Sequence, residues 1–283
     1  MIKRICLIAL LQAAPALADA TLIDTYVWSE SDPKFGGFSA IELADDGFGF
    51  VALSDRGHIT EGRMMREDGV ITGVEIGPLE VLRARHRAPL SRKERDSEGL
   101  AVAPDGTSFI SFEAAHGLRQ YDRGGGFGSD LITTPSFAAL QINSSLEALA
   151  MGPDGALYTL PERSGMATRP FPVYRYKNGK WDQPFTIPRY GPYLMSGADI
   201  GPDGRLYLLE RDFAGIGFRS RVRRFNLDGS GGEVVLQTRL GVHDNLEGIS
   251  IWQDDQGLRM TMISDDNFRF FQQTQIVEYR LTD

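Results

Sequence analysis

Cysteine is nearly absent from this chain. The 283 residues include one, Cys6, which lies in an N-terminal stretch that we expect to be removed. Thiolate chemistry and cysteine-rich zinc sites are therefore excluded for the mature protein. The sequence also lacks a G-x-S-x-G elbow, an H-E-x-x-H pair, a P-loop, a dinucleotide fingerprint and an EF-hand loop. Without disulfides, the stability of the fold must come from its packed core.

Long apolar runs are also missing, apart from one at the N-terminus. Lys3 and Arg4 precede the apolar run 5–11, and Ala16-Leu17-Ala18 matches a small-residue cleavage site. The alternatives are a membrane anchor or a buried first strand, but the run is too short to span a bilayer. We predict a cleaved secretory signal peptide at residues 1–18 and a single domain at residues 19–283. The mature protein is then periplasmic or extracellular in a bacterium, with no integral membrane segment.

Positive charge is in deficit. Removal of Lys3 and Arg4 leaves 28 basic residues against 38 acidic ones, a net charge of −10. This balance disfavours nucleic acid and anionic membranes as partners and is compatible with cation binding. We expect a monomer whose partner is a small molecule.

A unit of about 50 residues recurs five times. In each copy a short apolar strand runs into an Asp-Gly or Asp-Asp turn and returns to end on an acidic residue. The residue seven positions before the turn Asp marks the register, and the spacings between copies are 59, 49, 49 and 51 residues. The five register residues are Ser39, Glu98, Glu147, Ser196 and Glu247. A strand repeat of this length predicts a radial array, because one unit cannot bury its own face.

Each copy continues into further alternating segments separated by turns such as Asn178-Gly179 and Asp228-Gly229, which are hairpin signals. We predict an all-β fold: a β-propeller of five four-stranded blades. The 59-residue spacing leaves six blades as an alternative. The last unit is one strand short, so we expect the N-terminal segment 21–28 to complete it and remove an exposed sheet edge.

The acidic strand ends are the candidate site. In a regular hairpin, residues with the same number sum stand opposite each other, so Glu98 should face Glu113 and Glu147 should face Glu162. If the first strand of each unit lines the central channel, carboxylates converge at one mouth. The candidate metal ligands are Asp55, Glu98, Glu113, Glu147, Glu162, Glu210, Glu247 and Asp265.

Like charges placed so closely must be neutralised. Ca²⁺ is one candidate, since it takes six to eight oxygen ligands. Arginine is the second: Arg56, Arg163 and Arg211 each follow an acidic strand end, and a guanidinium fork fits a carboxylate or a phosphoryl group. Proton sharing is the third, and it would raise the pKa of some of these groups. Alternatively, the carboxylates only cap strands and link blades.

Catalytic candidates follow from the same geometry. Glu98 or Glu147 would act as a base, and the three arginines would clamp an anion. His116 and His243 lie close in sequence to Glu113 and Glu247 and are further candidates.

Six segments carry a resemblance to a known family. They are residues 36–41, 53–57, 97–101, 146–149, 208–212 and 245–249. In this order they resemble the phytase-like domain family of bacterial secreted proteins, described by "esterase-like activity of phytase", over about residues 35–281. The resemblance implies a β-propeller and a hydrolase of phosphate or other esters that uses Ca²⁺. Ser39 and Ser196 depart from the glutamate pattern and so put a fully acidic ring in doubt.

Two classes of function remain open. One is a hydrolase acting on a phosphoester or other ester, with a lactonase-like metal-dependent hydrolase as a near relative. The other is a non-catalytic periplasmic propeller that binds a ligand or a protein and uses its carboxylates as struts. The fold alone does not decide between them.

Overall fold

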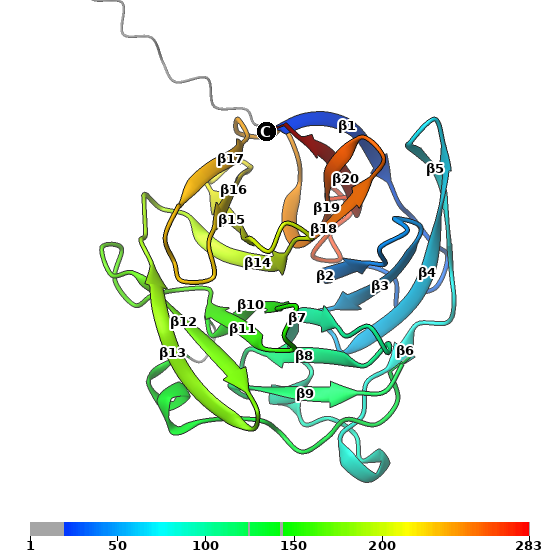
Figure 1. Ribbon diagram of the computed structural model, residues 1–283. Coiled ribbons are helices and arrows are strands. Elements are labelled where there is room, and N and C mark those ends of the chain that lie inside the picture. Colours follow the sequence, from blue (N-terminus) through cyan, green and yellow to red (C-terminus); the bar gives the residue numbers. More distant parts are fainter. Residues whose placement is uncertain (1–19, 124, 142–143, 283) are drawn as a thin grey trace, which may run out of the picture.

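The computed structural model describes residues 20–123, 125–141 and 144–282. The predicted signal peptide lies outside this part of the chain. Five sheets surround a central axis as the blades of a propeller (Figure 1). The prediction of an all-β, five-bladed propeller is confirmed. Among the described residues there is no helix long and apolar enough to cross a membrane.

The blades follow one another along the chain, and each begins with its innermost strand. Blade 1 contains β2 (Phe38–Leu43), β3 (Gly49–Ser54), β4 (His58–Glu67) and β5 (Val70–Ile76), and β6 (Glu80–Val81) pairs with β4. Blade 2 contains β7 (Ser97–Val102), β8 (Ser108–Phe112) and β9 (Gly117–Tyr121). Blade 3 contains β10 (Leu146–Met151), β11 (Leu157–Pro161), β12 (Phe171–Lys177) and β13 (Lys180–Ile187). Blade 4 contains β14 (Leu194–Ile200), β15 (Leu206–Phe213), β16 (Phe218–Phe225) and β17 (Glu233–Gln237).

Blade 5 closes the ring with both ends of the described chain. It contains β18 (Asn245–Asp254), β19 (Gly257–Asp265) and β20 (Gln275–Leu281), and β1 (Ala20–Val27) is its outermost strand. The predicted closure by the N-terminal segment is confirmed, since β1 pairs antiparallel with β20 from Ala20↔Leu281 to Val27↔Gln275. The pairing removes the edge that β20 would otherwise expose.

The six-bladed alternative is wrong for the described chain. The extra length of the first spacing forms β6 and two short 3-10 helices, η1 (Arg85–Arg87) and η2 (Arg92–Glu94), between blades 1 and 2. The outer position of blade 2 is occupied by isolated bridges, Leu118↔Ile132 and Tyr121↔Gly128.

The Asp-Gly signals mark the turns between the first and second strands of blades 2 to 4. The Asp105 carboxylate accepts a hydrogen bond from the Thr107 N–H at 2.9 Å, and Gly106 has φ +88°. Asp154 and Asp203 hold their turns in the same way, by accepting from the residue two positions on. An Asx turn of this kind fixes the reversal locally.

A β-bulge interrupts the first hairpin of every blade at the same place. In blade 3, for example, Leu146 pairs with Pro161 and Ala148 with Leu160, which leaves Glu147 as the extra residue. The shifts of the other blades fall at Ser39, at Glu98-Gly99, at Ser196 and at Glu247. The register residues of the sequence repeat are therefore the bulged residues of the structure. A bulge turns its side chain away from the regular alternation of the strand.

Small residues follow the bulges because the innermost strands of neighbouring blades pack against each other. A Cβ on Gly197 would lie 2.5 Å from the Glu247 carbonyl oxygen, and one on Gly248 would lie 2.7 Å from the Ala40 Cα. In blades 1 and 4 the bulged serine bridges to the next innermost strand: Ser39 donates to the Ser97 carbonyl at 2.8 Å and Ser196 to the Leu246 carbonyl at 3.2 Å.

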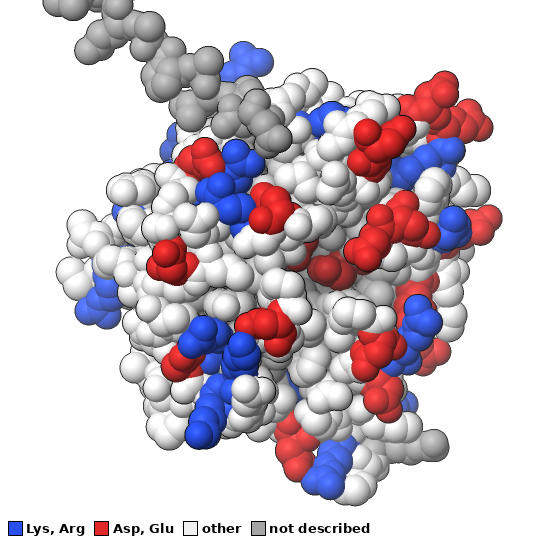
Figure 2. All heavy atoms as spheres, in the orientation of Figure 1, with Lys and Arg blue, Asp and Glu red and all other residues white. Residues whose placement is uncertain are grey.

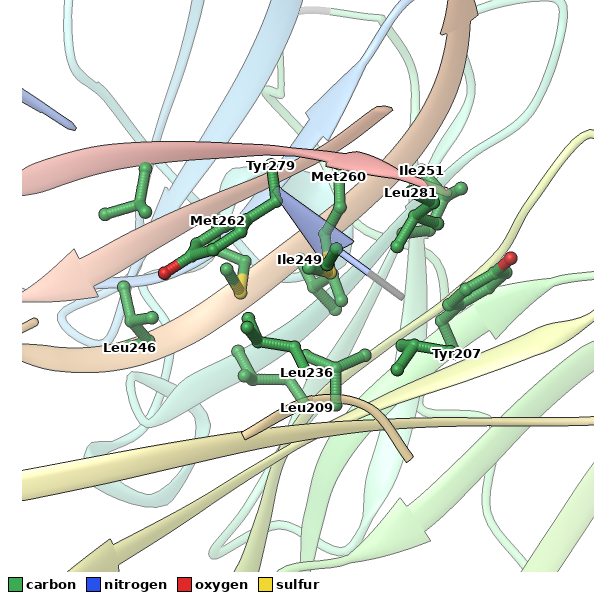
Figure 3. Packing of buried hydrophobic residues seen from close by; sticks show 14 residues of the cluster. Tyr207, Leu209, Leu236, Leu246, Ile249, Ile251, Met260, Met262, Tyr279 and Leu281 are labelled. Carbon is green, nitrogen blue, oxygen red and sulfur yellow. The ribbon is translucent and has the colours of Figure 1, made fainter. Parts of the chain in front are cut away.

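Apolar side chains fill the spaces between blades. Figure 3 shows the cluster between blades 4 and 5, in which Tyr207 and Leu209 of β15 face Ile249 of β18 and Met260 and Met262 of β19. Buried ion pairs supplement this packing. The Glu278 carboxylate of β20 forms ion pairs with Arg66 of blade 1 and with Arg259 of β19, each at 2.6 Å, so it links the last blade to the first.

Acidic side chains are also prominent on the surface. Figure 2 shows one face of the propeller, where they gather mainly on the right-hand side and also lie in a recess near the centre.

The close approach at Gly248 can be tested by adding a methyl group. Gly248→Ala places a Cβ 2.7 Å from the backbone of blade 1, and overpacking of this kind costs about 1–3 kcal/mol. We expect a lower midpoint of urea unfolding than for the wild type. Gly77→Ala is the control, because its nearest neighbour would lie at 3.5 Å. Equal midpoints for the two variants would contradict the role of the close approach.

Candidate functional site

Three of the five bulges place glutamates close to one another. Burial raises the pKa of Glu98 well above its usual value, and the nearby Glu147 and Glu247 raise it further. Burial likewise raises the pKa of Glu147, with Arg211 opposing the shift and Glu162 and Glu247 adding to it. The bulged glutamates of blades 2, 3 and 5 therefore share one poorly solvated region. We call it the acidic mouth and include the carboxylates of Asp55, Asp96, Glu98, Glu113, Glu147, Glu162, Glu247 and Asp265.

One part of the acidic mouth has the arrangement of a cation site. Carboxylate oxygens of Asp96, Glu98 and Glu113 all lie within 4.8 Å of one another. Burial and the adjacent Asp96 carboxyl raise the pKa of Glu113 to about 8. The Glu113 carboxylate also accepts a hydrogen bond from the Ser145 N–H of blade 3.

Arg211 enters the mouth from β15. Its guanidinium forms an ion pair with Glu247 and donates to Asn245 Oδ1 at 2.8 Å. The other terminal nitrogen lies 3.5 Å from Glu162 Oε1 and 3.6 Å from Glu147 Oε1. Burial tends to lower the pKa of Arg211. The surrounding carboxylates outweigh this effect and raise the pKa above its usual range, with the largest contribution from Glu247. Arg211 thus neutralises carboxylates of blades 3 and 5 at once.

Asp55, next to blade 1, and Asp265, of blade 5, add carboxylates to the mouth. Burial raises the pKa of Asp55 to about 7, and Asp265 adds to the shift. Burial and then Glu247 raise the pKa of Asp265 to about 7 as well, against a hydrogen bond from the Asn267 N–H. Arg56 stacks over the Phe268 ring with its guanidinium carbon 3.3 Å from the ring centroid.

The predicted direct pairing of the acids is wrong. Glu98 does not stand opposite Glu113, because the bulge shifts the register: Ser97 pairs with Phe112 and Leu100 with Ile110. Glu147 is the unpaired bulge residue and does not stand opposite Glu162. The carboxylates nevertheless meet through their side chains, which the bulge directs towards the mouth.

Glu210 does not join the acidic mouth. Its fully buried carboxylate accepts hydrogen bonds from Arg221 Nε at 2.7 Å and from Nη2 and Nε of Arg223 at 2.6 and 2.9 Å. The carboxylate is thus fully paired with arginines, which corresponds to the alternative that the acids have a structural role only. We therefore leave Glu210 out of the candidate site.

The two histidines differ in their surroundings. His243 lies against Tyr279, 2.6 Å from its hydroxyl, and burial lowers its pKa to about 4 with no carboxylate contributing. His116 lies beside the mouth, with Nδ1 2.7 Å from Ser145 Oγ. Burial and then Lys93 lower the pKa of His116. Of the two, His116 is the one placed to contact a molecule at the mouth.

Arg163 is at the solvent side of the mouth. It donates to Ser144 Oγ at 3.0 Å and to Glu162 at 3.1 Å, and about half of its side chain is exposed. Arg56 and Arg163 are therefore accessible to an anion, whereas Arg211 is occupied by internal ion pairs.

The axis of the propeller is almost closed. A cavity of about 10 Å³ remains between the bulges, with Glu147 and Glu247 in its wall, enough for about one water molecule. Glu147 is 6% exposed, and its Oε2 has no hydrogen-bond partner among the described residues. A buried carboxylate oxygen left in this way is costly unless water or an ion satisfies it.

Asp96 is the site residue that the sequence reasoning missed. It stands two positions before the register residue Glu98, where Ser145 and Asn245 stand in blades 3 and 5. Both of those also contact the acidic mouth. The polar residue two positions before each of these register glutamates was the sequence signal that could have identified Asp96.

The family model described as "Phytase-like: Esterase-like activity of phytase" matches residues 33–268. The match covers most of the sequence, and the chain belongs to this family. The resemblance found in the sequence motifs is confirmed. Membership, together with the propeller fold, suggests a propeller of the hydrolase type. Comparison with the curated proteins found no match.

Two solved structures with a similar course of the chain are the following. Virginiamycin B lyase from Staphylococcus aureus has 16% identity and a TM-score of 0.43, over 87% of this chain and 71% of that one. Regucalcin from Agrobacterium tumefaciens, described as a calcium-binding protein, has 12% identity and a TM-score of 0.48, over 87% of this chain and 91% of that one. Likeness at these levels carries no information on the activity of the present chain.

The raised pKa values predict a loss of stability with rising pH in metal-free protein. Asp55 and Asp265 titrate at about 7 and Glu113 at about 8 in the folded chain, against about 4 when unfolded. Between these pH values the folded state binds more protons than the unfolded state does. The stability that this contributes is fully present below pH 4 and is lost as the pH rises through 7 to 8.

We expect the melting temperature in chelator to fall between pH 5 and 8. Ion-paired acids titrate at more acidic pH and do not mask this fall. Hydrogen bonds from Arg280, for example, lower the pKa of Asp254. Glu113→Gln should make the profile less steep, because it removes one of the groups whose pKa is raised. A wild-type melting temperature that is constant or rises over this range would contradict the assignment.

Proposed function

We propose that this protein hydrolyses an ester of a small molecule at the acidic mouth and that Asp96, Glu98 and Glu113 hold a divalent cation, Ca²⁺, there. The observation that carries the proposal is the convergence of these three carboxylates within 4.8 Å. Glu147, which raises the pKa of Glu98, also has an oxygen without a hydrogen-bond partner among the described residues. Membership of a family described by esterase-like activity supports the reaction class.

The donor set fits a hard cation. Ca²⁺ prefers carboxylate and carbonyl oxygens and accepts irregular geometry, and all three ligands are carboxylates. Burial of so many acids disfavours their charged forms, and a cation would reverse that effect. When bound, it would polarise a phosphoryl or acyl oxygen as a Lewis acid.

Glu147 is the residue best placed to act as the base. One of its oxygens is oriented by Arg211, while the other has no hydrogen-bond partner in the described part of the chain and would accept a proton from a water molecule. The burial that raises its pKa brings the carboxylate closer to the range in which a general base works at neutral pH. Arg56 and Arg163, at the solvent side, would bind the anionic oxygens of the substrate.

A lactone is an internal ester and would meet the same groups, so a lactonase-like metal-dependent hydrolase is a variant of this proposal. The second candidate is a non-catalytic periplasmic propeller that binds a ligand or a protein. It is favoured by Arg211, which neutralises several carboxylates without any metal. For either function we propose a monomer exported by residues 1–18.

Calcium titration with matched variants tests the cation site. Ca²⁺ at about 100 times its Kd should raise the melting temperature by roughly 5–10 °C, since it binds only the folded state. Glu98→Gln should abolish the increase, whereas the exposed Glu75→Gln should retain it. An equal response to Ca²⁺ and chelator in all three proteins would argue against the cation and for the strut function.

Hydrolysis assays test the base. A panel of phytate, phosphomonoesters, 4-nitrophenyl esters and lactones identifies the substrate class in the wild type. Glu147→Gln should then lower kcat by about 10²–10⁴-fold, as expected for a lost general base, with little change in the response to Ca²⁺. Unchanged kcat would remove Glu147 from the mechanism. Activity towards lactones alone would favour the lactonase variant.

A further inference from the structure

A second cavity adjoins the acidic mouth on the side of blades 4 and 5. It has a volume of about 590 Å³, within the range of small-molecule pockets. It lies between the β15–β16 turn, the start of β18 and the loop that follows β19. Its apolar walls come from Phe213, Ile216 and Phe218 on one side and Phe271 on the other. We call it the apolar pocket.

Three large apolar side chains at this pocket are exposed to solvent. Phe213 is 60% exposed, Ile216 90% and Phe271 65%, although all three are large and apolar. Phe213 and Phe218 form an aromatic pair with centroids 5.0 Å apart. Adjacent exposed apolar side chains that line a concave surface are typical of ligand-binding sites.

The apolar pocket borders the candidate site at two residues. Arg211 and Asn245 line the pocket, and both also contact Glu247 of the acidic mouth. A molecule with its ester group at the carboxylates can therefore extend its organic group over Arg211 into the pocket. The two shared residues therefore favour part of the substrate as the occupant of the pocket.

The pocket wall is braced before any ligand binds. Asp244 accepts hydrogen bonds from Gln272 Nε2 and the Gln273 N–H, both at 2.9 Å, and so anchors the loop after β19 to the start of β18. Asn267 and Phe268 in the same loop have φ near +50°. A preformed wall lowers the ordering cost of binding.

Building on the proposed function, we propose that the apolar pocket binds the organic group of the substrate, and that the substrate is an ester with one aryl or medium-chain acyl group. A polyphosphate such as phytate does not suit the pocket. The arginines that line it are Arg211, whose guanidinium is held by glutamates, and Arg269. Affinity would come from apolar burial rather than from anion binding.

The neighbouring phenylalanines supply a matched pair of variants. Phe271 lines the pocket, whereas Phe270, 99% exposed, does not. Neither is part of the core, so Phe271→Ser and Phe270→Ser should both fold. The assays use two pairs of substrates, and the members of each pair differ in the organic group. One pair is 4-nitrophenyl acetate and 4-nitrophenyl octanoate, and the other is glycerol 2-phosphate and phenyl phosphate.

In the pair that is hydrolysed, we expect the wild type to prefer the more apolar member by at least about 10-fold in kcat/KM, as for an apolar specificity pocket. Phe271→Ser should lose this preference mainly through a higher KM, and Phe270→Ser should keep it. No preference in the wild type, or equal effects of the two variants, would overturn the pocket assignment while leaving the proposed hydrolysis intact.

Absence of hydrolysis of every ester would instead count against the proposed function. Calorimetric titration with phenylphosphonate and methylphosphonate then decides about the pocket: tighter phenylphosphonate binding that Phe271→Ser alone removes supports it, and equal binding overturns it. Sedimentation adds a further outcome. A wild-type dimer that Phe271→Ser dissociates would show that a second copy of the chain occupies the pocket.

Discussion

The close approach of the five innermost strands around the axis governs both the packing and the chemistry of this propeller. Glycine or alanine follows every bulged residue, and at the three glycines a Cβ would meet the backbone of the next blade. The bulge that accommodates this approach turns the preceding side chain out of the regular strand alternation. In blades 1 and 4 that side chain is a serine that bonds to the next blade. In the other three it is a glutamate, and these glutamates are brought together at one mouth.

The fold treats its buried acids in two ways. Glu210 and Glu278 are each enclosed by two arginines within hydrogen-bond distance, so their charges are matched locally. At the acidic mouth the carboxylates outnumber the guanidiniums, and Arg211 is shared among several of them. A purely structural role would be served by the first arrangement at every blade. The incomplete neutralisation at the mouth is therefore the feature that separates a site from a strut, and burial makes it costly without a bound cation or protons.

Much of this architecture could be predicted from the sequence. The 50-residue period, the Asp-Gly turns and the unpaired N-terminal segment gave five blades and the closure of the ring, because each reports a local or pairwise constraint. The position of Glu98 relative to Glu113 could not be predicted in this way. The bulge depends on contact between blades, which no single hairpin contains, and it displaces the register that a residue sum assumes. Glu210 was misplaced for a related reason: its arginines come from β16, and pairing within the blade decides where they point.

The apolar pocket was not predictable either, since Phe213 ends β15 while Ile216 and Phe271 lie in two loops without a periodic pattern. Its position beside the acidic mouth bears on substrate selection. Carboxylates repel a free polyanion, and each additional phosphate would add to that repulsion. An apolar group carries no such penalty, and its burial provides binding energy remote from the reacting bond, which can be used to orient the ester. A mouth that is acidic on one side and apolar on the other is therefore better matched to an ester with a single charged or polar end than to the polyphosphate that gives the family its name.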